Sequence, residues 1–353
     1  MDGVYLDWAA TSPIVRFPID ASKQWCNPNA AYAYEERRAL MDCEERIKTA
    51  IGAKEGHVLY FRCATDAIEW LYKAVSNAIN PFDGWWAHSP YEHDCCLFGH
   101  EYMPYDKYPA DFYCHQLVSH ITGQYFDPAK IRAQLDDARE TLATPYFICD
   151  CTAAMGKISL GDVCKYADCI FMSGHKIGCP GLSFMWVNDR LFKLLGGSKD
   201  VRNQWGLKHG SLSVGHVLAL ADAVEWACDD ERIDDMDNKY VALFERLHRK
   251  LKNTDIDCSV IADNVPCTCA INAIRLPGIN ADALQQYCAS KGIYIGVGHS
   301  SCAESADYRV LKAYGLTEQE ASEVIRVSFG PESGFEDVKA LVDSIKEYRD
   351  KFC

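Results

Sequence analysis

The segment at residues 168–187, DCIFMSGHKIGCPGLSFMWV, places the polar hexapeptide SGHKIG (173–178) between two apolar runs. Short apolar runs of this kind are typical of buried strands, so the hexapeptide is expected to connect the end of one strand to the next. It contains Lys176, whose ammonium group is costly to desolvate unless another group neutralises its charge or reacts with the amine. Two interpretations follow: an ordinary turn lysine, or the reactive amine that the sheet presents.

The rest of the chain alternates between apolar runs and amphipathic helices. Strand–helix alternation predicts an α/β fold, with a mainly parallel mixed sheet sandwiched by helices and a smaller α+β C-terminal domain. The expected division is a large domain over residues 15–229 and a small domain over 1–14 and 230–353. Strands are expected at 57–61, 85–88, 146–150, 169–172, 182–187, 258–262, 267–276, 293–297 and 324–330. Helices are expected at 30–51, 64–75, 128–143, 214–227, 234–251, 281–291, 305–314 and 335–350.

Charge and hydropathy narrow the class of protein. The 353 residues carry a formal net charge of −14, which disfavours electrostatic binding to nucleic acid or to an anionic membrane. No run approaches the ~18 consecutive apolar residues that a membrane span requires. The N-terminal sequence MDGVYLDWAA lacks the basic and apolar regions of a signal peptide, so a cytoplasmic location is expected.

The chain contains 18 cysteines, a count that raises the question of disulfides or a metal centre. A chain of this length can build its own core, and in a reducing compartment its thiols stay free. The close pairs do not form the CxxC…CxxC pattern of a structural zinc site, so no metal site is expected and the cysteines are interpreted as small buried hydrophobes. These pairs are Cys95-Cys96, Cys149/Cys151 and Cys267/Cys269.

Polar residues follow four of the expected strands, and ligands of open α/β sheets collect at the carboxyl ends of strands. Thr65 opens the helix after HVLYF, where it could hold a phosphate; alternatively, Thr65 or Asp66 simply caps that helix. His93 follows the strand near residue 88 and could stack on a planar ligand or be structural. Asp150 ends YFICD, where a carboxylate needs a cationic partner. The fourth group is the segment 173–176.

Together these features indicate a site for a planar, phosphorylated cofactor with one ring nitrogen and one reactive carbonyl. Pyridoxal 5'-phosphate (PLP) fits this description. Lys176 would bind its aldehyde covalently, and Asp150 would keep its ring nitrogen protonated so that the ring can withdraw electrons.

Nine motifs occur in an order that resembles the class V, NifS-like PLP enzymes, which are cysteine desulfurases and selenocysteine lyases. The resemblance extends over essentially the whole chain and implies the PLP-dependent transferase fold type I. The motifs are YLDWAATSP (5–13), NPNAAYAYE (27–35), CATDA (63–67), YEHD (91–94), FICDCTAAMGKISL (147–160), SGHKIGCPG (173–181), KHGSLS (208–213), GHSSC (298–302) and VIRVSFG (324–330).

The resemblance implies a role for each matching position. Lys176 would be the cofactor-binding and catalytic lysine, Asp150 the partner of the ring nitrogen, and His93 the ring-stacking, catalytic histidine. Cys302 would be the nucleophile that accepts sulfur, although with so many cysteines one on a loop is also unremarkable. The remaining implied roles are phosphate binding by Thr65, Ser173 and His175, cofactor binding by Ala64, binding of the phosphate of a neighbouring subunit by Ser211, and binding of the substrate carboxylate by Arg326.

The implied activity is conversion of L-cysteine to L-alanine with a persulfide left on Cys302, or selenocysteine lysis, by a homodimer that could serve a sulfur-acceptor protein. The chain departs from the family pattern at Ala153, where a glutamine is usual, and at Ser211, where a threonine is usual. The Asn-containing segment expected between 115 and 150 is also missing. A β-eliminating lyase or an aminotransferase acting on another amino acid is therefore an alternative. A retired family member acting as a binding scaffold is a second.

Overall fold

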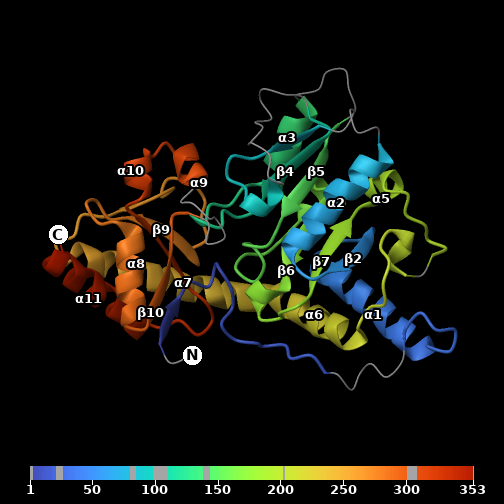
Figure 1. The fold of residues 1–353 in the computed structure, drawn as a ribbon, viewed down its shortest axis with the longest axis horizontal. Helices are drawn as coiled ribbons and strands as arrows, with labels where there is room; N and C mark the ends of the chain where they lie inside the picture. Colours follow the sequence, from blue (N-terminus) through green and yellow to red (C-terminus); the bar gives the residue numbers. More distant parts are fainter. Residues whose placement is uncertain are drawn as a thin grey trace. The chain divides into compact units, whose positions relative to one another are not determined.

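The computed structural model describes residues 3–20, 27–79, 85–97, 110–137, 144–201, 203–299 and 308–352. The chain forms two compact units (Figure 1). The larger unit comprises Ile14–Leu117 and Asp127–Asp230, and the smaller unit comprises Met1–Pro13, Val118–Phe126 and Glu231–Cys353. Each unit contains one sheet.

A six-stranded mixed sheet forms the centre of the larger unit. The four strands β3 to β6 are parallel to one another, and β7 is antiparallel to both of its neighbours, β2 and β6. All five residues of β2, of β6 and of β7 are buried, as expected for strands covered on both faces. In spatial order the strands are β2 (His57–Phe61), β7 (Ser183–Val187), β6 (Cys169–Ser173), β5 (Tyr146–Asp150), β4 (Phe112–Gln116) and β3 (Trp86–His88).

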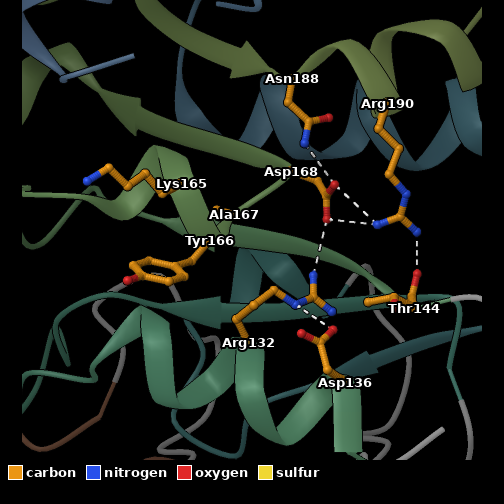
Figure 2. Close-up of a pocket in the computed structure, with 9 residues that line it drawn as sticks. All are labelled: Arg132, Asp136, Thr144, Lys165, Tyr166, Ala167, Asp168, Asn188 and Arg190. Atoms are coloured by element: carbon orange, nitrogen blue, oxygen red, sulfur yellow. Dashed lines mark hydrogen bonds and ion pairs between the residues drawn. The ribbon is translucent and has the colours of Figure 1, made fainter. Parts of the chain in front are cut away.

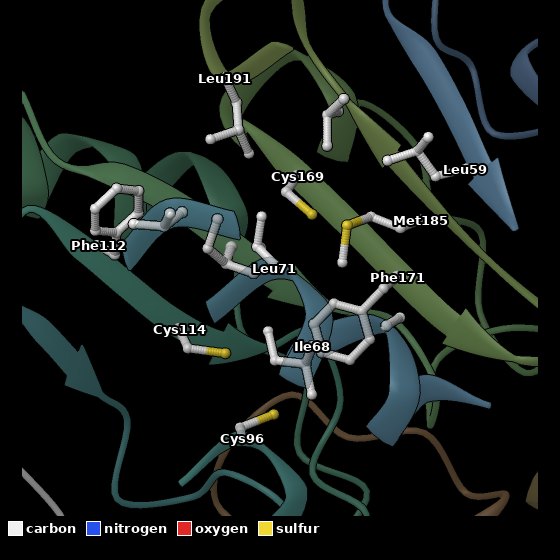
Figure 3. Packing of buried hydrophobic residues seen from close by; sticks show 14 of the residues in the cluster. Leu59, Ile68, Leu71, Cys96, Phe112, Cys114, Cys169, Phe171, Met185 and Leu191 are labelled. Carbon is white, nitrogen blue, oxygen red and sulfur yellow. The ribbon is translucent and has the colours of Figure 1, made fainter. Parts of the chain in front are cut away.

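Helices flank this sheet, and α2 (Ala64–Ala78) covers the centre of one face (Figure 3). Ile68 and Leu71 of α2 pack with Phe171 of β6 and Met185 of β7, and all four side chains are fully buried. Burial of each such side chain contributes about 1.5–3 kcal/mol to folding. The other helices of this unit are α1 (Tyr34–Ala50), α3 (Pro128–Asp137), α4 (Val163–Tyr166), α5 (Asp189–Leu194) and α6 (Val214–Ala227), with 3-10 turns η2 (Asp94–Cys96), η3 (Gly174–Ile177) and η4 (Gln204–Gly206).

The smaller unit contains a five-stranded sheet in the order β1-β10-β11-β9-β8. Only the β1–β10 pair is parallel, and the remaining pairs are antiparallel. The strands are β1 (Val4–Leu6), β10 (Ile293–Val297), β11 (Val324–Ser328), β9 (Ile271–Arg275) and β8 (Ser259–Val260). The helices are α7 (Asp230–Lys252), α8 (Ala281–Ser290), α9 (Arg309–Ala313), α10 (Glu318–Ala321) and α11 (Phe335–Phe352). Within the described chain, no helix combines the length and apolarity needed to cross a membrane.

The predicted α/β architecture is confirmed, but several elements differ from the sequence expectation. Strands β1 and β4 and the short helices α4, α5 and α10 were not expected. The segment of β4, FYCHQ, alternates aromatic and polar residues and ends in two polar side chains, so it lacks the continuous apolar run of the other strands. The strand expected at 258–262 is reduced to Ser259–Val260. The helix expected at 305–314 is described only as α9, because residues 305–307 lie outside the described chain.

One buried carboxylate, Asp168, lies just before β6 at the amino end of the parallel strands (Figure 2). Its oxygens accept hydrogen bonds from the backbone N–H of Phe147 and from the side-chain amide of Asn188, both at 2.9 Å. Arg132 and Arg190 form ion pairs with it at 3.5 and 3.3 Å. These residues line a cavity of about 470 Å³, in which the two guanidinium groups already face Asp168. The arrangement anchors the start of β6.

We expect Asp168→Asn to lower the free energy of unfolding by about 2–3 kcal/mol, because the substitution removes charge-assisted hydrogen bonds and leaves the largely buried Arg132 guanidinium without this carboxylate. Urea denaturation would measure the change. The matched control is Asp162→Asn, which breaks the exposed ion pair with Lys165 and should change the value by less than about 1 kcal/mol. Equal effects of the two substitutions would contradict the anchoring role.

Candidate functional site

Asp150 ends β5, and its side chain is buried, with the residue 5% exposed. The backbone N–H of Thr152 donates a hydrogen bond to its Oδ1 at 2.8 Å. Burial raises the pKa of this carboxyl, while the hydrogen bonds from Thr152 and the positive charge of Lys176 oppose the rise. A buried carboxylate in this position is stabilised by any cationic group that reaches it.

Lys176 lies in the 3-10 turn η3, directly after β6. Because β5 and β6 are parallel neighbours with Asp150 opposite Phe171, both strands end at the same edge of the sheet. The turn requires glycine at two places. A Cβ at Gly174 would lie 2.3 Å from the carbonyl oxygen of Leu182, and Gly178 has a φ of +83°. The tight turn thus holds the Lys176 amine near the Asp150 carboxylate.

His175 lies within electrostatic range of both Lys176 and His93. Burial, together with the charges of these two residues, lowers the pKa of His175 to about 4. His93 precedes η2, and its Nδ1 accepts a hydrogen bond from the backbone N–H of Cys95 at 3.2 Å. The structure therefore brings four of the predicted site residues together at one edge of the sheet: His93, Asp150, His175 and Lys176.

The first turn of α2 contains Ala64, which is buried, and Thr65, which is exposed. The expectation that Thr65 or Asp66 caps this helix is wrong. The cap is Cys63, whose thiol accepts a hydrogen bond from the backbone N–H of Asp66 at 3.4 Å. The hydroxyl of Thr65 is thus not used for capping, and the first-turn N–H groups of a helix suit an anion. Ser173, the last residue of β6, is buried and accepts a hydrogen bond from the hydroxyl of Ser183 at 3.4 Å.

Ser211 is exposed and lies on the loop before α6. Its hydroxyl donates to Oδ1 of Asn27 at 3.1 Å and accepts from Nδ2 of Asn29 at 3.3 Å. It lines a cavity of about 230 Å³ together with Lys208, whose Nζ donates to the carbonyl oxygen of Tyr60 at 2.5 Å. Burial lowers the pKa of Lys208.

Arg326 is on β11 in the smaller unit, and the residue is 4% exposed. Its Nη1 donates to the carbonyl oxygen of His120 at 3.0 Å, and its Nη2 donates to Oδ1 of Asp7 at 2.7 Å. A guanidinium has five N–H groups, so these two bonds leave each terminal nitrogen with a second N–H. The carboxylate of Asp7 neutralises the charge of the Arg326 guanidinium.

Cys302 lies outside the described residues. The described chain stops before it at His299, whose Nε2 lies 2.9 Å from Oδ1 of Asp282 at the start of α8.

A second group of residues at the same sheet edge was missed by the sequence analysis. Gln116, the last residue of β4, lies opposite Asp150 in the register of β4 and β5. Glu92, Cys96 and Cys114 have ligand atoms that all lie within 4.8 Å of one another, and all three residues are fully buried. The polar end of FYCHQ could have indicated Gln116 had β4 been recognised as a strand, because parallel strands align their carboxyl ends.

Comparisons with known proteins bear on the family and the fold of the chain. A family model described as aminotransferase class-V matches residues 111–341, more than half of the chain. The NifS protein of Halalkalibacterium halodurans is 23% identical over 381 residues, which cover 99% of this chain and 98% of that protein. The cysteine desulfurase IscS of Dictyoglomus turgidum is 23% identical over 389 residues, covering 99% and 95%. A solved structure of a NifS-like protein has a TM-score of 0.82 at 18% identity and covers 99% of each chain, which confirms the predicted fold.

The lowered pKa of His175 gives a test of the site's electrostatics. Between pH 6.5 and about 4 the unfolded chain binds a proton at this ring and the folded chain does not, so lowering the pH across this window lowers the free energy of unfolding. His175→Gln removes this contribution, which is at most about 1.4 kcal/mol per pH unit. We therefore expect the wild type to lose more stability than the variant in urea denaturation across this range. His115, whose pKa burial also lowers to about 4, contributes to the slope that remains in the variant. Parallel curves would contradict the assignment.

Proposed function

Because the chain belongs to the aminotransferase class-V family, as its ordered motifs predicted, we propose that it is a PLP-dependent cysteine desulfurase. The observation that carries the proposal is the amine of Lys176 held beside the buried carboxylate of Asp150 at the carboxyl edge of the sheet. Relatives named as cysteine desulfurases align with this chain over nearly its whole length, which supports this activity over others in the family.

The residues at this edge fit PLP. Burial of Asp150 is unfavourable for its ionised form, and a protonated ring nitrogen is a cation that would offset that cost. His93, fixed through its Nδ1, would stack on the ring. The first turn of α2, with Ala64 and Thr65, would hold the phosphate together with Ser173 and His175. When bound, PLP withdraws electrons from the Cα of an amino acid substrate.

Arg326, Lys176 and Cys302 would each carry out one step of the reaction. Arg326 would bind the substrate carboxylate through the second N–H of each terminal nitrogen, a geometry that suits a planar carboxylate. Nζ of Lys176 would take the proton from the substrate Cα. The thiolate of Cys302 would attack the substrate sulfur, so that an S–S bond forms as the Cβ–S bond breaks. After proton return, the products are L-alanine and a persulfide on Cys302.

The proposal extends to assembly. In a homodimer, Ser211 would reach the phosphate in the partner's site, and its exposure on the loop before α6 is consistent with such a contact. The persulfide would be passed to a sulfur-acceptor protein. The cytoplasmic location remains a prediction from the sequence.

Alternatives within the family depend on the position of Ala153, which is buried near the end of β5 where a glutamine is usual. A pocket with fewer hydrogen bonds to the cofactor could favour β-elimination or transamination instead. Selenocysteine lysis would use the same residues with selenium in place of sulfur. A binding scaffold without activity is disfavoured by the Lys176–Asp150 arrangement, which a scaffold does not need.

We expect Lys176→Ala to lower the rate of alanine formation from L-cysteine by about 100-fold or more, because the variant loses the amine that moves the proton. Alanine would be quantified by chromatography after incubation with L-cysteine and a reductant. The matched control is Lys165→Ala, since Lys165 is an exposed lysine of the same unit paired with Asp162. Retained activity in Lys176→Ala would exclude this lysine as the catalytic group.

The role of Cys302 is tested separately, by product analysis. In the wild type we expect alanine and sulfide in equal amounts under reducing conditions, and Cys302→Ser should abolish both. The matched control is Cys267→Ser, which removes an exposed thiol of the smaller unit and should leave the products unchanged. Pyruvate and ammonia instead of alanine, in a reaction indifferent to Cys302→Ser, would support the β-eliminating alternative.

A further inference from the structure

A group of sulfur and carboxylate donors is formed by residues close to His93 in the sequence and by one residue of β4. One oxygen of Glu92 and the Sγ atoms of Cys96 and Cys114 lie within 4.8 Å of one another, and all three residues are 0% exposed. Cys96 and Cys114 share a hydrogen bond between their thiols. Figure 3 shows these two side chains next to each other at the edge of the core cluster. We call Glu92, Cys96 and Cys114 the thiol cluster.

The spacing of the thiol cluster matches what a tetrahedral metal ion needs. The Sγ atoms of Cys96 and Cys114 and one oxygen of Glu92 all lie within 4.8 Å of one another. In a tetrahedral zinc site with Zn–S bonds of about 2.3 Å, neighbouring sulfur ligands lie about 3.8 Å apart. Two thiols and one carboxylate provide three donors, the number of protein ligands in zinc sites that leave the fourth position to a small ligand. Borderline-soft donors of this kind select Zn²⁺ over Mg²⁺ or Ca²⁺.

The charge distribution also favours a cation. The carboxylate of Glu92 and the thiols of Cys96 and Cys114 are fully buried and lie around the same space. An ionised carboxylate is costly to bury unless its charge is compensated. A divalent cation would neutralise the carboxylate and displace the thiol protons. Relief of the free-energy cost of burying the carboxylate would then contribute to metal affinity.

We propose that Glu92, Cys96 and Cys114 form a binding site for a thiophilic divalent cation such as Zn²⁺, with the fourth position taken by a small ligand such as water. The proposal does not rest on the proposed function. The site borders the predicted PLP site, because ligand atoms of Cys95, Cys96 and Asp150 also lie within 4.8 Å of one another. It joins η2 to β4 and so fixes the backbone that directly follows His93. The sequence analysis expected no metal site, because the ligands do not follow a CxxC pattern.

The test begins with metal analysis of the full-length protein. Protein purified from cells grown with added zinc should contain about one Zn²⁺ per chain after dialysis against a weak chelator, as measured by inductively coupled plasma mass spectrometry. The double variant Cys96→Ser/Cys114→Ser should lose this zinc. Two controls that each remove a thiol elsewhere, Cys267→Ser at an exposed site and Cys288→Ala at a buried one, should retain it. A wild type without zinc, or zinc retained by the double variant, would overturn the proposal.

A second measurement covers the case in which the double variant does not fold, which circular dichroism would reveal. Wild-type protein produced with Co²⁺ should show the intense visible absorption of tetrahedral cobalt in the red region, with thiolate-to-cobalt charge transfer. Glu92→Gln, which keeps the shape of the side chain, should weaken retention of the metal. Absence of the cobalt bands in the wild type, or a disulfide joining Cys96 and Cys114 in mass spectra of the alkylated protein, would overturn the proposal. The cobalt bands and the mass spectra are read without the alanine assay, so failure of this proposal is distinguished from failure of the proposed function.

Discussion

The electrostatic interaction between Asp150 and Lys176 is the constraint on which the candidate site depends. Asp150 is buried at the end of β5, where desolvation raises its pKa, and the positive charge of Lys176 acts against that rise. The two residues can meet because β5 and β6 are parallel neighbours that end at one edge. The glycines at 174 and 178 then turn the chain so tightly that Lys176 stays at this edge. A buried carboxylate and a nearby amine are the two groups that a PLP enzyme needs most.

The same strand is held at its other end by a second buried charge. Asp168 precedes β6, and Arg132, Arg190 and Asn188 hold its carboxylate. At this amino end the opposite charges neutralise each other within the chain, which suits an anchor. At the carboxyl end the partners of Asp150 are a backbone N–H and an amine, an arrangement that can accept a cationic ring. The five residues of β6 therefore separate the charges around Asp168 from the edge of the sheet at which Lys176 lies.

Much of this could be predicted from the sequence, and the failures have physical causes. Strands β5 and β6 were predicted because they are continuous apolar runs, and Asp150 and Lys176 followed from their ends. The strand β4 was missed because its residues alternate, and its end carries Gln116 into the site. The cap of α2 was also missed, because a cysteine thiol is a weak acceptor and Cys63 does not stand out beside Thr65. The segment Val118–Phe126 belongs to the smaller unit through contacts distant in sequence, such as the bridge from Gln124 to Cys267, which no local pattern reveals.

The cysteines illustrate the limit of composition most clearly. Many are small buried hydrophobes, as predicted: Cys169, for example, packs in the core cluster. Cys96 and Cys114 are just as fully buried, yet they lie beside the carboxylate of Glu92 rather than among hydrocarbon alone. Eighteen positions separate them in the sequence (114 − 96), and only the parallel pairing of β3 with β4 brings the two segments together. The chemical environment of a thiol is therefore set by the fold. Cysteines with identical burial can thus pack the core in one place and offer a cation its ligands in another.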